Sequence, residues 1–135
     1  MKLQFKKRYL LISIILLCLI AVFYFYTKFD TVTIHIKNNT SQSLTGLTVN
    51  YTGSSSEYSI PTIPANSSCT KQLTLPADFD EGQIEMIAYG RNYTILGYLE
   101  RGTFHRLTVN INTIDKNKKL TLKVKTSFLS SCFHI

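Results

Sequence analysis

The feature that most constrains this chain is an uncharged run over residues 9–26, preceded by a short basic segment. At about 1.5 Å per helical residue, the run reaches roughly 27 Å, close to the roughly 30 Å hydrocarbon core of a bilayer. We therefore expect a cytoplasmic basic segment at residues 1–8, followed by a transmembrane helix with a short juxtamembrane link at residues 9–29.

A cleaved signal peptide and a lipid-anchored leader are the alternatives to a permanent anchor. Signal peptidase sites need small residues, whereas four aromatic residues at 23–26 follow the apolar run directly. Aromatic side chains of this kind suit the membrane–water interface. Bacterial lipoprotein leaders place a small residue before the modified cysteine, and Leu17 before Cys18 does not fit that pattern. A buried core helix leaves the one-sided basic flank unexplained, so an uncleaved signal anchor is expected.

The orientation of this anchor follows from the distribution of basic residues. Four basic residues precede the apolar run, namely Lys2, Lys6, Lys7 and Arg8. Because cytoplasmic flanks are enriched in Lys and Arg, the N-terminus is expected in the cytoplasm. The expected location is the cell membrane, with one membrane span and the C-terminal domain outside the cytoplasm.

The formal charge of +7 is concentrated in two short segments. Residues 1–8 contain four basic residues and residues 116–125 contain five lysines, so the rest of the chain is slightly acidic. A nucleic-acid-binding protein would distribute basic and aromatic residues over one face. Nucleic acid is therefore not an expected partner.

Residues 30–126 show the period of two that is typical of half-buried strands. Val32, Ile34 and Ile36 alternate with polar residues, and similar alternations recur at roughly ten-residue spacing. This spacing predicts an all-β fold, a single antiparallel β-sandwich of immunoglobulin-like or fibronectin-III-like architecture with about 7–8 strands. An up-and-down barrel and an OB-like barrel are the alternatives, and residues 127–135 are expected to form a tail.

The most apolar part of the domain is a predicted hairpin with its turn at Arg91 and Asn92. One face is expected to be core and carries Ile84, Met86, Ala88, Ile95, Gly97 and Leu99. The opposite face carries a possible partner-contact patch of Ile87, Tyr89, Leu96 and Tyr98. Tyrosine is enriched in buried interfaces, which favours a contact role. The alternative is a central hairpin covered on both faces by the protein's own loops.

The last predicted strand has a stripe of three lysines, Lys119, Lys123 and Lys125. Charged side chains on an edge strand prevent edge-to-edge aggregation, which is one explanation. The other is contact with an anionic surface, either lipid head groups or wall polymers.

Catalytic and metal-binding motifs are missing from the sequence. There is no glycine-rich phosphate loop, G-x-S-x-G elbow or HEXXH spacing, so an enzyme is not expected. The cysteines and histidines lack metal-ligand spacing, so neither a metal site nor a cofactor is expected. A turn of Asp78, Asp80 and Glu81 has the oxygen ligands that calcium prefers, with a solvated acidic turn as the simpler reading.

Two cysteines lie outside the predicted anchor, Cys69 and Cys132, and a disulfide between them is possible in an oxidising compartment.

The layout resembles small, mostly uncharacterised membrane-anchored proteins of Gram-positive bacteria with an extracytoplasmic β-sandwich. The similarity rests on three segments: Asn38-Asn39-Thr40, Ile60-Pro61-x-Ile63-Pro64 and Gly97-Tyr98-Leu99-Glu100-Arg101-Gly102. No activity and no site residue come with this resemblance.

The function expected from the sequence is a binding or accessory module of the cell envelope, with another envelope protein as a possible partner. One alternative is an envelope hydrolase or transferase that uses His35 or His105 with Glu100 or Asp78. A passive stalk or spacer domain is the other.

Overall fold

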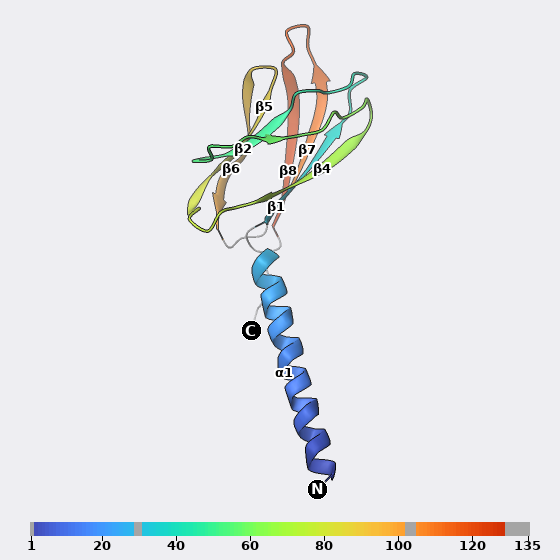
Figure 1. Ribbon diagram of the computed structural model, residues 1–135. Helices are drawn as coiled ribbons and strands as arrows, with labels where there is room; N and C mark the ends of the chain where they lie inside the picture. Colours follow the sequence, from blue (N-terminus) through green and yellow to red (C-terminus); the bar gives the residue numbers. More distant parts are fainter. Residues whose placement is uncertain (1, 29–30, 102–104, 129–135) are drawn as a thin grey trace.

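The computed structural model describes residues 2–28, 31–101 and 105–128, and it contains one N-terminal helix and two β-sheets (Figure 1). The elements in chain order are α1 (Lys2–Lys28), β1 (Thr31–Asn38), β2 (Thr48–Tyr51), β3 (Tyr58–Ser59), β4 (Ser68–Thr74), β5 (Glu81–Ala88), β6 (Arg91–Glu100), β7 (His105–Ile114) and β8 (Leu120–Phe128). Strand β8 therefore ends two residues beyond the expected end of the domain, and residues 129–135 of the expected tail lie outside the described part.

The eight strands form two four-stranded sheets, which confirms the all-β, two-sheet prediction. The first sheet has the order β4-β1-β7-β8 and the second has the order β3-β2-β5-β6. All neighbouring strands are antiparallel except β1 and β7, which are parallel. The order differs from that of constant-type immunoglobulin domains, where the first strand shares a sheet with the second, fourth and fifth.

The direction of β1 defines two ends of the sandwich. At the near end, next to α1, β1 and β7 begin while β4 and β8 end. At the far end lie the β7–β8 turn and the β5–β6 turn (Figure 1). The Leu120 amide donates a hydrogen bond of 2.9 Å to the Tyr93 hydroxyl, which joins the two sheets there.

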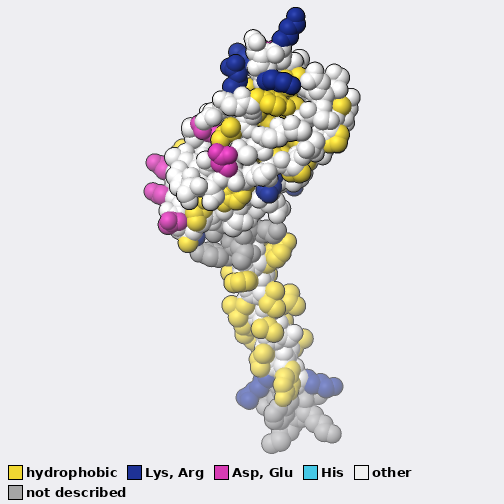
Figure 2. All heavy atoms as spheres, turned by 45° about the horizontal axis from the view of Figure 1, so that its top comes forward, with side chains coloured by type: hydrophobic (Ala, Val, Ile, Leu, Met, Phe, Trp, Pro, Cys, Tyr) yellow, Lys and Arg dark blue, Asp and Glu magenta, His cyan; other side chains and the backbone are white. Residues whose placement is uncertain are grey.

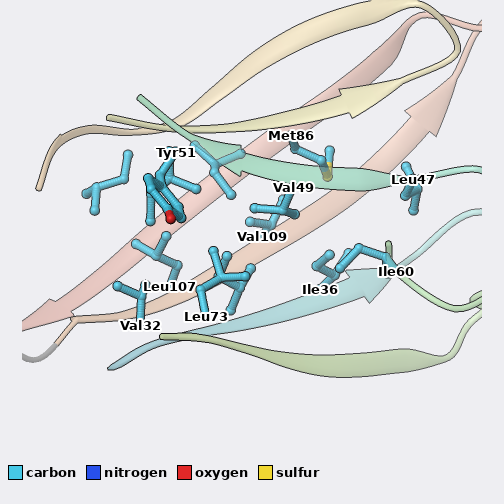
Figure 3. Packing of buried hydrophobic residues seen from close by; sticks show 14 of the residues in the cluster. Val32, Ile36, Leu47, Val49, Tyr51, Ile60, Leu73, Met86, Leu107 and Val109 are labelled. Atoms are coloured by element: carbon cyan, nitrogen blue, oxygen red, sulfur yellow. The ribbon is translucent and has the colours of Figure 1, made fainter. Parts of the chain in front are cut away.

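The core lies between the sheets and follows the predicted alternation. Val32, Ile34 and Ile36 on β1 are fully buried. Figure 3 shows Val32 and Ile36 in the same cluster as Val49 and Met86 of the second sheet. Each large apolar side chain buried in this way stabilises the fold by roughly 1.5–3 kcal/mol.

The β5–β6 hairpin differs from the prediction in its turn and in its second strand. The turn consists of Tyr89 and Gly90, both with positive φ (51° and 73°), as a tight two-residue hairpin turn requires. The pairing of β5 with β6 is irregular on both sides of the Ile84–Leu96 pair. As a result, the consecutive residues Ile95 and Leu96 are both buried. Gly97 was expected in the core but is exposed, because these irregularities reverse the alternation of inward and outward residues along this part of β6.

Buried hydrogen bonds of the Asn38 side chain join the far end of β1 to two loops, one at residue 42 and one at residues 63–64. The Asn38 side chain is 0% exposed, and its amide nitrogen donates to the carbonyls of Gln42, Ile63 and Pro64 at 2.8, 3.2 and 2.9 Å. Its oxygen accepts from the Thr40 amide and hydroxyl at 3.0 and 2.7 Å. Every hydrogen-bonding atom of this amide therefore has a partner inside the protein.

We expect Asn38→Ala to destabilise the domain by about 2–4 kcal/mol, because it removes all five side-chain hydrogen bonds of this amide and leaves the Thr40 backbone amide without its acceptor. Asn39→Ala is the matched control, since Asn39 is exposed and its side chain donates an exposed hydrogen bond of 3.1 Å to Asn112. Urea denaturation of the full chain in neutral detergent, followed by near-ultraviolet circular dichroism, measures both values. Equal and small losses for the two variants would contradict the role of the network.

Candidate functional site

The N-terminal helix is long and apolar enough to cross a membrane. The candidate membrane span covers residues 6–25, in which the basic residues 6–8 precede an uncharged run, and none of this span is buried against the rest of the protein. The side chains along it are strongly exposed, from Tyr9 to Phe25. The helix is therefore not part of the domain core.

The four residues of the predicted contact patch do not come together on one surface. Leu96 is only 7% exposed and lies opposite Ile84, because the irregularity after Thr94 turns it inward. Tyr89 lies in the far-end turn, where the Lys118 ammonium is 5.4 Å from the centre of its ring. Ile87 is half-buried, which leaves Tyr98 as the exposed member.

Tyr98 is the single large apolar side chain that is strongly exposed in the described part of the β-domain, at 58%. Its hydroxyl donates to a Glu81 carboxylate oxygen at 3.3 Å. The negative charge of Glu100 is the main cause that raises the pKa of the Tyr98 phenol, with desolvation and Glu81 adding to it. An isolated, protonated tyrosine of this kind makes a small contact surface.

The lysine stripe is divided by the structure. Lys119 lies in the far-end turn, where its backbone amide donates to the Asp115 carboxylate at 2.8 Å. Lys123 and Lys125 lie within β8, an edge strand, and both are exposed. This position agrees with protection of a sheet edge.

The register places other basic residues beside the two strand lysines. Lys37 on β1 and Lys123 on β8 lie level with each other, on either side of Asn110. Arg106 on β7 is exposed and points to the same side by the alternation of the strand. We call these residues the basic face: Lys37, Arg106, Lys123 and Lys125. The strands of the first sheet contain no Asp or Glu.

The outer face of the second sheet has the opposite charge. We call its carboxylates the acidic face: Glu57, Glu81, Glu85 and Glu100. Glu85 accepts hydrogen bonds from Gln83 and Asn92 at 2.9 and 3.3 Å, and Glu57 accepts one from Thr48 at 3.0 Å. Since these donors are neutral, the bonds leave the negative charge in place. Acidic side chains gather on one flank of the domain, away from most of the Lys and Arg side chains, in Figure 2.

A shallow groove lies beside the acidic face, between residues 51–58 and 76–81, with a volume of about 530 Å³. Its floor is aromatic, because Tyr51 packs against Tyr58 and Phe79 with ring centres 6.1 and 5.4 Å apart. Its rim carries the predicted acidic turn and the hydroxyls of Ser54, Ser55 and Ser56. No group of three or more His, Cys, Asp or Glu side chains in the described residues is arranged to hold a metal ion.

Among the described residues of the hydrolase alternative, His35 lies on a different sheet from Glu100 and away from the groove that Asp78 lines. His35 lies in the first sheet, where its ring nitrogen Nδ1 is 2.9 Å from the Thr70 hydroxyl. Asp78 lines the groove and Glu100 ends β6, both on the side of the second sheet. The His105 side chain lies outside the described part.

The predicted disulfide stays a prediction, because Cys132 lies outside the described residues. Cys69 is half-buried on β4 and packs against the core. Burial raises the pKa of its thiol, and the nearby Lys71 partly opposes that shift.

No protein-family description matches the chain, and no curated protein matches it. Among solved structures, an NMR structure of a protein from Eubacterium rectale is similar over 70% of this chain and 88% of that protein, with 16% sequence identity and a TM-score of 0.42. A similarity at this level carries no argument about fold or function.

We expect Gly82→Ala to disturb the groove, because a Cβ atom there would lie 2.8 Å from the Thr52 Cβ and 3.3 Å from the Phe79 ring. The expected loss is about 1–3 kcal/mol of unfolding free energy. Gly97→Ala is the matched control, because nothing lies within 4 Å of its added Cβ. Thermal unfolding of both variants measures the difference, and a Gly82→Ala variant as stable as the control would contradict this packing.

Proposed function

We propose that this chain is a single-pass membrane protein that holds one β-domain at the outer surface of the cell membrane and acts by binding. The observation that supports this proposal most is the helix, since none of its 20-residue candidate membrane span is buried. An apolar helix of this length exposed to water would carry a large unfavourable free energy. A bilayer supplies the apolar surroundings that the domain does not.

The proposed orientation has the N-terminus in the cytoplasm. Lys6, Lys7 and Arg8 are exposed at that end of the helix, as cytoplasmic flanks commonly are. The near end of the sandwich then faces the membrane, because β1 begins three residues after α1 ends. The far end and both charged faces project into the extracytoplasmic space.

A binding or accessory role is supported by the surfaces of the domain. The described side chains present two faces of opposite charge and a shallow groove. The Thr70 hydroxyl beside the His35 imidazole lies on the first sheet and does not line that groove. Oppositely charged faces favour recognition of charged partners and steer their approach. An enzyme and a passive spacer are the competing roles, and no specific contact among the described residues favours either one.

We expect a cysteine introduced at Asn117, in the far-end turn, to react with a membrane-impermeant maleimide in intact cells. The test uses a chain in which Cys18, Cys69 and Cys132 are replaced by Ala. A second variant, Gln4→Cys, is the matched control and should react only after the membrane is permeabilised. Reaction of Gln4→Cys in intact cells, or extraction of the chain by alkaline carbonate, would contradict the proposal.

A further inference from the structure

We propose that the basic face binds an extended anionic polymer whose repeating groups are phosphates or carboxylates. This inference rests on the proposed function and names the partner of the binding module. The face consists of Lys37, Arg106, Lys123 and Lys125, which come from three adjacent strands of the first sheet. All four side chains are exposed.

The charges are close enough to act together. Lys37 and Lys123 lie two strands apart at one level, which is about 10 Å, and Lys123 and Lys125 lie two residues apart along β8, which is about 7 Å. These spacings are similar to the Debye length of about 8–10 Å at physiological salt. A single strand of anionic polymer therefore experiences the summed attraction of the face.

The side chains that lie between the basic residues do not favour single-stranded nucleic acid as the ligand. Polar side chains fill the outer positions that pair across the strands with the basic residues or lie beside them. These side chains are His35, Thr70, Thr108 and Asn110, and imidazole is the only ring among them. Proteins that bind single-stranded nucleic acid stack its bases on aromatic side chains, and none of Phe, Tyr or Trp is placed among these rows. The face therefore fits a ligand held by charge and hydrogen bonds.

The direction of the face favours a polymer over the lipids of the protein's own membrane. Arg106 lies level with Thr33 near the start of β1, whereas Lys37 and Lys123 lie four residues farther along the strands. At about 3.4 Å per residue, that is roughly 14 Å toward the far end. In the proposed orientation the face rises away from the lipid head groups, and a polymer that extends outward follows it.

Fluorescently labelled long-chain polyphosphate tests this proposal, with poly-glutamate as the carboxylate probe. The full chain is reconstituted in nanodiscs of neutral lipid, and binding is followed by anisotropy between about 50 and 200 mM salt. We expect the variant with Lys37→Gln, Lys123→Gln and Lys125→Gln to bind roughly tenfold more weakly. Its salt slope should fall by about 2, at about 0.7 per lost contact to a single strand.

The matched control removes the same charge from the far-end turn, through Lys116→Gln, Lys118→Gln and Lys119→Gln. We expect this control to retain the affinity of the unchanged chain within about twofold, because the turn lies beyond the face. Equal losses in the two variants would overturn the proposal, since net charge alone would then explain binding. Self-association of the chain at low salt without polymer binding, or binding only to nanodiscs that contain anionic lipid, would overturn it as well.

The two proposals fail separately. A cytoplasmic position of Asn117→Cys in the labelling experiment contradicts the orientation and leaves the binding measurement unaffected. Absence of polymer binding with correct labelling contradicts only the partner.

Discussion

The organisation of this protein depends on the pairing of β1 between β4 and β7. This strand begins three residues after the apolar helix ends, and both of its edges are hydrogen-bonded within the first sheet. A central strand cannot shift its register without moving its buried side chains to the solvent face. The pairing therefore fixes which end of the sandwich lies next to the helix and which turns lie farthest from it.

The far end of β1 is fixed by a different interaction, the buried Asn38 amide. Its bonds to Gln42, Ile63 and Pro64 join the strand to two loops, and each of these carbonyls also accepts a second hydrogen bond within the same region. Two of the three segments behind the resemblance, at residues 38–40 and 60–64, meet in this network. The conformation of this end is therefore specified by hydrogen bonds as well as by the apolar core.

The sequence predicted which residues of a strand are buried better than it predicted which strands pair with each other. Alternation located the core residues of β1 and β5, because side-chain direction in a strand depends only on the period of two. The parallel pairing of β1 with β7 could not be read from that period, since alternation carries no information about the adjacent strand. The sequence predicted Leu96 on the outer face and Gly97 in the core, whereas the structure buries Leu96 and exposes Gly97. The cause is a register irregularity, which the residue pattern of an apolar run does not reveal.

The charged faces also depend on strand pairing and could not be predicted from the sequence alone. Lys123 and Lys125 stood out as a stripe in the sequence, but Lys37 and Arg106 are distant in the chain and join them only through the register of the first sheet. The acidic face lies on the other sheet, so a domain of small net charge has two faces of opposite charge. Composition averages over both faces and therefore hides this separation, which is the main basis for a binding role.

The most direct test of this account measures how far each end of the domain lies from the membrane. A dye on Gln72→Cys, near the end of β4, should be quenched strongly by a quencher attached to lipid head groups. Because Ile114 lies eight residues beyond Arg106, which is level with Gln72 across β1, a dye on Asn117→Cys should sit about 27 Å farther out and remain unquenched. Equal quenching of the two dyes, or stronger quenching at Asn117, would contradict the account.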